Sequence, residues 1–197
     1  MIIGLTGSSG SGKSVAAEFF AENGFYVIDF DKISREICNK GEPCLNELTE
    51  QFGCDIIDSD GNLMRKKLGN IVFGDSEKLK TLNRITHKYI LHRAQILVEQ
   101  NKHRNIVYDA PLLFEAGLHK HCKYVVSIIC DRDTQIRRIM ERDGISRDTA
   151  EDRINAQHPK EFYIQQSDYY VDNSSTKQEF THKLEKLLED IYADNCQ

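Results

Sequence analysis

The sequence predicts an α/β fold of three layers, in which helices cover both faces of a mainly parallel sheet of five strands. Short apolar runs alternate with helical patterns along the whole chain, and this order is typical of parallel sheets with helical crossovers. Residues 2–14, IIGLTGSSGSGKS, join an apolar run to a helical pattern through a glycine-rich loop, which is the context of a phosphate-binding site. With 197 residues the chain can bury one sizeable core, so we expect a single domain, 1–197, with appendages.

The glycine-rich loop has the spacing G-x-x-x-x-G-K-[ST], from Gly7 through Gly12 to Lys13 and Ser14. Glycines let a loop turn its N–H groups inward on a phosphate chain. Lys13 is expected to reach the β- and γ-phosphates and the Ser14 hydroxyl to bind Mg²⁺, while the start of the next helix favours an anion. A flexible turn is the alternative, but the spacing and the flanking elements disfavour it. The residues predicted to bind ATP here are Ser9, Gly10, Ser11, Gly12, Lys13, Ser14 and Val15.

The first half of the chain continues with a helix that ends at Asn23-Gly24 and a strand over 25–29. This strand–helix–strand order predicts a parallel pair of strands with a right-handed crossover. Residues 32–103 then form a helical insertion, which is longer than a crossover needs and which we interpret as the part that binds the acceptor. Its helices are predicted at 32–39, 43–52, 63–73 and 76–100.

The second half of the chain supplies the remaining strands and a lid. The strand over 105–110 ends at Pro111, and the continuous apolar run 124–130 is expected at the centre of the sheet. Two charged helices follow, and we interpret residues 137–160 as a lid. The remaining predicted elements are helices at 133–143 and 146–157, a strand at 169–172 and a last helix with Ser175 and Gln178 as its capping box.

Composition and charge exclude several classes of protein. With 40% hydrophobic and 29% charged residues, the chain is not expected to be disordered or fibrous, and a net charge of −5 argues against general binding of nucleic acids. No apolar run approaches the roughly 20 residues that cross a bilayer, and the chain begins with an expected strand rather than an export signal. We therefore expect a cytoplasmic protein that binds neither nucleic acid nor membrane.

The cysteines are expected to be reduced thiols, because no C-x-x-C pair is present and no export route is visible. Neither their spacing nor that of the histidines matches a zinc site. The six are Cys38, Cys44, Cys54, Cys122, Cys130 and Cys196.

Three aspartates follow predicted strands. Asp29 and Asp31 stand at alternate positions, so their side chains are expected to point the same way, where one carboxylate could accept a proton from an alcohol and the other could orient groups. The alternative, that Asp31 only caps the next helix, stays open. Asp109 ends the third strand, where a carboxylate can hold Mg²⁺ through water, although an aspartate at a strand end is common without such a role.

Arg138 and Arg142 are four residues apart and therefore share a face of their predicted helix. Guanidinium groups on a lid would stabilise charge on a transferring phosphoryl group and exclude water, whereas the alternative is a solvated helix with ion pairs. From the residue types alone, Glu115 is slightly favoured as a functional residue over a solvated charge at a helix start. His87 is expected to be a surface or packing residue, and Arg65 a solvated charge unless an anionic substrate approaches.

Several segments together resemble the dephospho-coenzyme A kinases, a family of P-loop kinases. The resemblance implies a P-loop kinase fold and transfer of the γ-phosphoryl group of ATP to the ribose 3′-hydroxyl of dephospho-CoA, which gives CoA in the last step of its synthesis. The matching segments are GLTGSSGSGKS, VIDFDKISRE, DGNLMRKKLGNIVF, LNRITH, DAPLLFE, RRIMERDGIS, RINAQ and YYVDN.

Carried over by position, the resemblance implies that Asp31 is the base or orienting group for the ribose hydroxyl and that Asp29 supports it. It implies lid roles over ATP for Arg138 and Arg142, and positions near the nucleotide for Gln157 and Asn173. The residues implied on the acceptor side are Arg65, His87, Pro111, Leu112 and Glu115. The sequence departs from the family pattern at Lys88, where proline is frequent, and at Ser174-Ser175, where a glycine is frequent.

Two alternative functions are compatible with a phosphate loop. A kinase for another small molecule or for a nucleoside monophosphate would share the phosphate loop, and its substrates alone would distinguish it. A GTP-dependent switch would need an N-K-x-D segment, but the segment from Asn101 to Arg104 lacks the aspartate.

Overall fold

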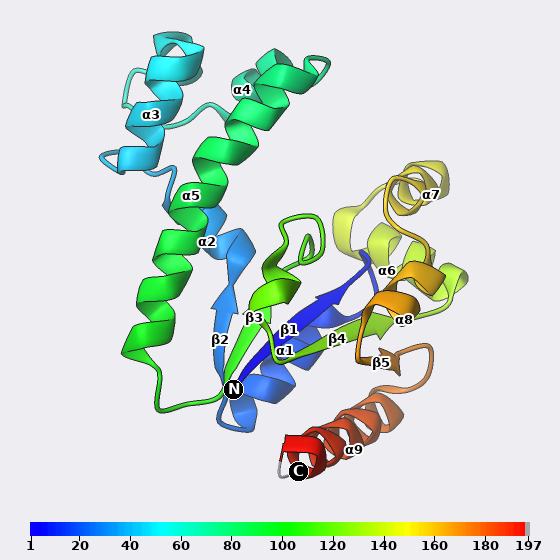
Figure 1. Cartoon of the computed structure of the whole chain (residues 1–197). Coiled ribbons are helices and arrows are strands. Elements are labelled where there is room, and N and C mark those ends of the chain that lie inside the picture. The colour runs from blue at the N-terminus through cyan, green and yellow to red at the C-terminus, as the bar shows by residue number, and fades with distance from the viewer. Residues whose placement is uncertain (196–197) are drawn as a thin grey trace. The chain divides into compact units, whose positions relative to one another are not determined.

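The computed structural model describes residues 1–195 and divides into two compact units. The first unit contains Met1–Ile28 and the chain from His103 onward, and the second contains Asp29–Lys102. Figure 1 shows the elements of both units along the chain. Cys196 lies outside the described residues, and the five cysteines inside them are free thiols.

A five-stranded sheet has the order β2-β3-β1-β4-β5. β1 pairs in parallel with β3 and with β4, and β4 pairs in parallel with β5, which confirms the predicted mainly parallel sheet. The strands are β1 (Ile2–Gly7), β2 (Tyr26–Asp29), β3 (Ile106–Asp109), β4 (Tyr124–Ile129) and β5 (Tyr169–Asp172).

Two predictions about the sheet are wrong in detail. β1 and β2 are not neighbours, because β3 lies between them. The crossover from β1 to β2 leaves one strand position open, and β3 occupies this position later in the chain, after the second unit. β4 is an interior strand between β1 and β5, but the centre of the sheet is β1. An apolar run requires cover on both faces, which any interior strand receives.

Nine helices and two short 3₁₀ turns complete the described residues. The helices are α1 (Lys13–Glu22), α2 (Phe30–Glu36), α3 (Pro43–Phe52), α4 (Arg65–Val72), α5 (Ser76–Gln100), α6 (Arg132–Asp143), α7 (Arg147–Asn155), α8 (Lys160–Gln166) and α9 (Lys177–Asn195), and the turns are η1 (Cys54–Ile56) and η2 (Leu118–His121).

The core of the first unit lies between the sheet and two helices. Side chains of β1, β3, β4 and β5 pack with those of α1 and α9, including the fully buried Phe20 and Ile191; α9 lies beside β5 in Figure 1. On the opposite face of β1, a Cβ atom on Gly4 would lie only 2.8 Å from the Leu113 side chain. The segment after β3 therefore packs closely over the sheet, so both faces are covered.

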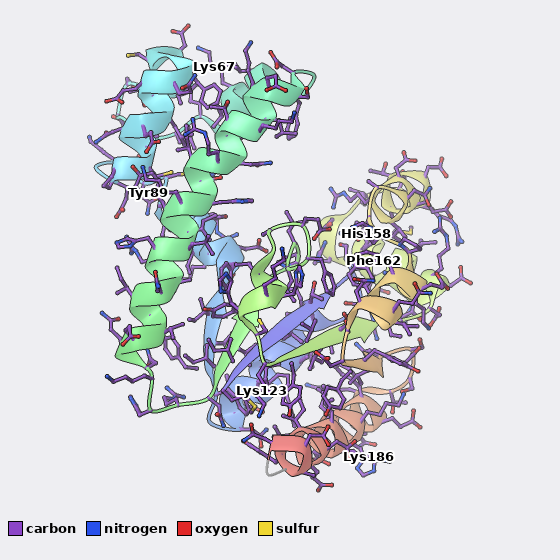
Figure 2. The ribbon with its side chains drawn as sticks, in the orientation of Figure 1. Lys67, Tyr89, Lys123, His158, Phe162 and Lys186 are labelled. Atoms are coloured by element: carbon purple, nitrogen blue, oxygen red, sulfur yellow. The ribbon has the colours of Figure 1, made fainter. Side chains whose placement is uncertain are left out.

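The second unit consists of helices, as the sequence predicts. α3 and α5 have the predicted bounds, and α2 begins at Phe30 because the Asp29 carboxylate accepts a hydrogen bond from the Lys32 N–H at 2.8 Å. The hydroxyl of Tyr89, labelled in Figure 2, donates to Glu47 Oε2 at 2.6 Å and so joins α5 to α3. This bond and the buried Leu48 and Ile85 hold the helices of the unit together.

The last third of the chain differs from the prediction at two places. α8 was not predicted; its short apolar face, with the buried Tyr163, follows Pro159, which stands at the N-cap. The predicted capping role of Ser175 is wrong, because Thr176 Oγ1 accepts the hydrogen bond from the Glu179 N–H at 3.3 Å and α9 begins one residue later than expected. No helix within residues 1–195 combines the length and the hydropathy of a membrane span.

Candidate functional site

The phosphate loop, residues 7–14, leads from β1 into α1 and requires its glycines. Gly10 and Gly12 have positive φ angles of 78° and 95°, in the region that residues with a Cβ atom rarely adopt. A Cβ atom on Gly12 would lie 2.1 Å from Asn173 Nδ2, and one on Gly10 would lie 2.9 Å from the Gln135 carbonyl oxygen. Conformation and space therefore both select glycine at these two positions.

The start of α1 offers backbone donors to an anion. The Ser9 N–H donates to Gln157 Oε1 at 2.9 Å, and the Ser11 N–H donates to the Ser8 carbonyl at 3.1 Å. The N–H groups of Gly12, Lys13 and Ser14 have no acceptor among residues 1–195. Unpaired N–H groups at the positive end of a helix dipole form a site for phosphate.

Lys13 and Asp109 form an ion pair between the end of β3 and the start of α1. The two side chains are only 18% and 12% exposed. Their closeness follows from the sheet, because β1 and β3 are parallel neighbours and so end at the same edge. The lysine predicted for the phosphates and the carboxylate predicted for the metal are thus brought together, and Ser14 is exposed beside Lys13.

The two predicted lid arginines have different surroundings. Arg138 is half-buried, and its guanidinium donates to the backbone carbonyls of Gly10, Ser11 and Asn173 at 3.1–3.4 Å. Arg142 is exposed; it makes two bonds of 2.8 and 2.9 Å to the Asp143 carboxylate and one of 3.4 Å to Ser9 Oγ. Arg138 therefore holds the loop backbone, whereas Arg142 lies at its rim.

The Asp143 carboxylate also pairs with Arg153, which joins the end of α6 to α7. Hydrogen bonding from Arg142, with the charges of Arg142 and Arg153, lowers the pKa of Asp143 to about 2. Because the folded pKa lies below the unfolded value of about 3.9, this carboxylate stabilises the fold above about pH 4, and the stabilisation is lost as the pH falls towards 2.

Replacing Asp143 by asparagine is therefore expected to lower the melting temperature at about pH 6 but hardly at all below about pH 2, where the wild-type carboxylate becomes mostly protonated. Thermal unfolding followed by circular dichroism at several pH values between these limits measures the difference. Asp148→Asn, an exposed position on α7, is the matched control. A difference between wild type and Asp143→Asn that stayed constant across this pH range would contradict the assignment.

The predicted acceptor residues of the first unit follow β3. The Pro111 carbonyl accepts from Thr6 Oγ1 at 3.2 Å, and Leu112 is 63% exposed. Glu115 Oε1 lies 3.2 Å from Nε2 of His158, whose ring stacks on Phe162 with centroids 3.8 Å apart. Figure 2 shows His158 and Phe162 pointing toward one another.

The predicted residues of the second unit lie on α2, α4 and α5. The Asp29 carboxylate caps α2, and Asp31 is exposed in the first turn; the strand ends at Asp29, so the alternation that would have made both side chains point the same way does not apply. Arg65 Nη2 donates to the Arg35 carbonyl at 3.2 Å, and His87 is half-buried on α5.

Arg65 also interacts with Cys38, a buried thiol that forms a pair with Cys44. A hydrogen bond from Cys44, together with the positive charge of Arg65, lowers the pKa of Cys38 below its usual value, against the opposing effect of burial. Arg65 is therefore held on one side by the end of α2, through Arg35 and Cys38.

Gln135 is a residue of this region that sequence reasoning missed. Its side chain is only 7% exposed, and its Nε2 donates to Ser8 Oγ and, at 3.1 Å, to the Ser9 carbonyl. The sequence signal was available, because Gln135 stands next to Ile136 on the buried face of α6. A buried amide on an apolar helix face needs partners, and the phosphate loop supplies them.

A cavity of about 490 Å³ opens beside the phosphate loop within the first unit, a volume typical of ligand sites. Its wall includes Ser8, Cys130, Asp131, Gln157, His158 and Lys160. Among residues 1–195 no cluster of three or more histidine, cysteine or acidic side chains could hold a metal by itself.

Comparison with known proteins agrees with these features. The model of the dephospho-CoA kinase family matches residues 1–179. The dephospho-CoA kinase of Fusobacterium nucleatum is 41% identical over 191 residues, which cover 97% of this chain and 98% of that protein. The dephospho-CoA kinase of Shouchella clausii is 40% identical over 181 residues, covering 90% and 92% of the two chains.

Solved structures give the same result. The dephospho-CoA kinase from Campylobacter jejuni has a TM-score of 0.72 and 26% identity, over 98% of both chains. The protein TT1252 from Thermus thermophilus has a TM-score of 0.85 and 28% identity, over 98% of this chain and 97% of that one. A shikimate kinase from Bacteroides thetaiotaomicron, at 15% identity and a TM-score of 0.57, shares the fold alone. The predicted P-loop kinase fold and the predicted resemblance are confirmed, and the chain belongs to the dephospho-CoA kinase family.

Proposed function

We propose that this protein transfers the γ-phosphoryl group of ATP to the ribose 3′-hydroxyl of dephospho-CoA, with the phosphate loop as donor site and Asp31 as the base or orienting group for the hydroxyl. The observation that carries the proposal is the phosphate loop itself, with unpaired N–H groups at Gly12, Lys13 and Ser14 beside the Lys13–Asp109 pair, in a chain of this family.

On the donor side, the loop from Ser9 to Val15 binds the phosphates, with Gln157 and Asn173 next to it. Lys13 exchanges its contact with Asp109 for the β- and γ-phosphates when ATP binds. Arg142 neutralises charge that develops on the transferring oxygens, and Arg138 contributes its charge from the loop backbone. The lid, 137–160, excludes water that would otherwise hydrolyse ATP.

The residues present fit Mg²⁺. Ser14 and Asp109 offer hydroxyl and carboxylate oxygens, and a Mg²⁺ site in kinases needs few protein ligands because waters and substrate phosphates complete it. Ser14 would hold the ion directly and Asp109 through water. When bound, the ion supplies positive charge that offsets charge on the β- and γ-phosphate oxygens.

On the acceptor side, Asp29 is engaged as the cap of α2, whereas Asp31 is exposed. This division supports Asp31 as the group that accepts or orients the hydroxyl proton, with Asp29 as its supporting neighbour. Helical residues 32–103 are proposed to bind dephospho-CoA through Arg65 and His87. The loop after β3 contributes Pro111, Leu112 and Glu115. The whole chain, 1–197, acts as one P-loop kinase domain in the cytoplasm on these two small molecules.

The experiment that tests the proposal is ADP release from ATP and Mg²⁺ in the presence of dephospho-CoA, AMP, adenosine or no acceptor. Among these acceptors, only dephospho-CoA is expected to cause ADP release. Each equivalent of ADP is expected to be accompanied by one equivalent of a product with a 3′-phosphate, which ³¹P NMR detects. Equal turnover with AMP or adenosine would assign a different kinase, and nucleotide hydrolysis without any acceptor would favour a switch.

A further inference from the structure

Two side chains of α6 hold consecutive backbone carbonyls of the phosphate loop. Gln135 Nε2 donates to the Ser9 carbonyl at 3.1 Å. One guanidinium nitrogen of Arg138 lies 3.4 Å from the Gly10 carbonyl and 3.4 Å from the Ser11 carbonyl. The outer side of the loop is therefore held by polar groups of a single helix.

Asn173, directly after β5, completes the arrangement. Its Nδ2 donates to the Ser11 carbonyl at 2.7 Å, and its own carbonyl accepts from Arg138 Nη2 at 3.1 Å. The side chain fills the space next to Gly12, where even one Cβ atom would clash. Gln135, Arg138 and Asn173 thus form one connected group, which we call the carbonyl clamp.

Peptide geometry gives the clamp a consequence for the anion site. In a trans peptide the carbonyl of one residue and the N–H of the next point in opposite directions, and no peptide bond of the described chain is cis. Bonds to the Ser9 and Ser11 carbonyls therefore turn the N–H groups of Gly10 and Gly12 away from the clamp. Neither N–H has an acceptor among the described residues.

We propose that Gln135, Arg138 and Asn173 are positioning residues, which hold the carbonyls of the phosphate loop outward so that the N–H groups of Gly10 and Gly12 face the nucleotide phosphates. None of the sequence motifs assigns a role to Gln135. For Arg138 it differs from that of a lid arginine, because the guanidinium acts through the loop backbone. The inference rests on the proposed function for the identity of the donor nucleotide.

Burial makes the clamp sensitive to loss of a single donor. Gln135 and Asn173 are 7% and 5% exposed, so water cannot replace their amide groups at the loop carbonyls. Gln135→Glu and Asn173→Asp keep the size of the side chain but replace the donor by a carboxylate oxygen. Repulsion between this oxygen and the carbonyl would turn the peptide and remove an N–H group from the phosphates.

The test is isothermal titration of ATP, without acceptor, into the full-length wild type, Gln135→Glu and Asn173→Asp. The dissociation constant for ATP is expected to rise at least about tenfold in each variant. The KM for dephospho-CoA and the melting temperature without nucleotide are expected to change little. Arg138→Lys keeps the positive charge but loses the forked geometry of the guanidinium donors. Its dissociation constant for ATP is expected to lie between those of the wild type and the two carboxylate variants. Gln165→Glu, exposed on α8, is the matched control.

Affinities within twofold of wild type in Gln135→Glu and Asn173→Asp would overturn the inference, as would equal losses for ATP and for dephospho-CoA. If a carboxylate variant fails to fold, Gln135→Met removes the donor without adding charge, and the same criterion applies. Failure of the proposed function is distinct: the wild type would then bind ATP and respond to these substitutions but would not phosphorylate dephospho-CoA.

Discussion

Replacing Lys13 by methionine is expected to lower kcat about 10²–10³-fold, because the ammonium group is one of the few charges available to the transferring phosphoryl oxygens. Methionine keeps most of the length and the apolar stem of lysine. Steady-state ADP release with saturating dephospho-CoA measures the loss. Lys186→Met on α9, where Lys186 is exposed (Figure 2), is the matched control and is expected to keep full activity.

The same substitution also removes the ion pair between Lys13 and Asp109, whose side chain is only 12% exposed, so a loss of stability accompanies the loss of rate. Lys13→Met combined with Asp109→Asn separates the two effects. The double variant is expected to regain melting temperature, because Asp109→Asn removes the negative charge that the Lys13 ammonium group offsets, but to regain no activity. A kcat that returned together with the melting temperature would assign Lys13 a structural role only.

The sequence predicted the number of strands and their positions because each strand is a short apolar run bounded by a glycine, a proline or a charged residue. It did not predict that β3 separates β1 from β2. Strand order depends on how far each crossover reaches across the sheet, and the pattern of a single strand does not carry that information. The short α8 was missed for a related reason, since its seven residues are too few for a clear helical period.

Residues of the candidate site could be predicted where a local sequence pattern, such as a motif spacing or a strand end, is tied to one chemical role. Lys13 and Ser14 follow from the loop spacing, and Asp109 follows from the end of its strand. Gln135 and His158 were not found, because their partners, the Ser9 carbonyl and Glu115, are more than 40 residues away. Contacts of that kind depend on the packing of α6 and α8, which local sequence patterns do not determine.

Replacing Asp31 by asparagine is expected to lower kcat about 10²–10⁴-fold, the usual contribution of a group that accepts a proton in the transition state. The KM for ATP is expected to change little, because Asp31 is not among the residues proposed to bind the donor. Rates of ADP release over a range of both substrates measure the two constants separately. Asp55→Asn, at an exposed position of η1 in the same unit, is the matched control.

Stability distinguishes the two neighbouring carboxylates. Asp29 caps α2 through the Lys32 N–H, so Asp29→Ala is expected to cost about 1 kcal/mol of unfolding free energy. Asp31 is exposed in the first helical turn, where removing the charge is expected to cost less than that. A large loss of rate with an intact fold in Asp31→Asn, and a loss of stability with little loss of rate in Asp29→Ala, would separate the catalytic role from helix capping at two positions that are two residues apart. If Asp31→Asn kept wild-type kcat, Asp31 would not be the group that accepts or orients the proton of the acceptor hydroxyl.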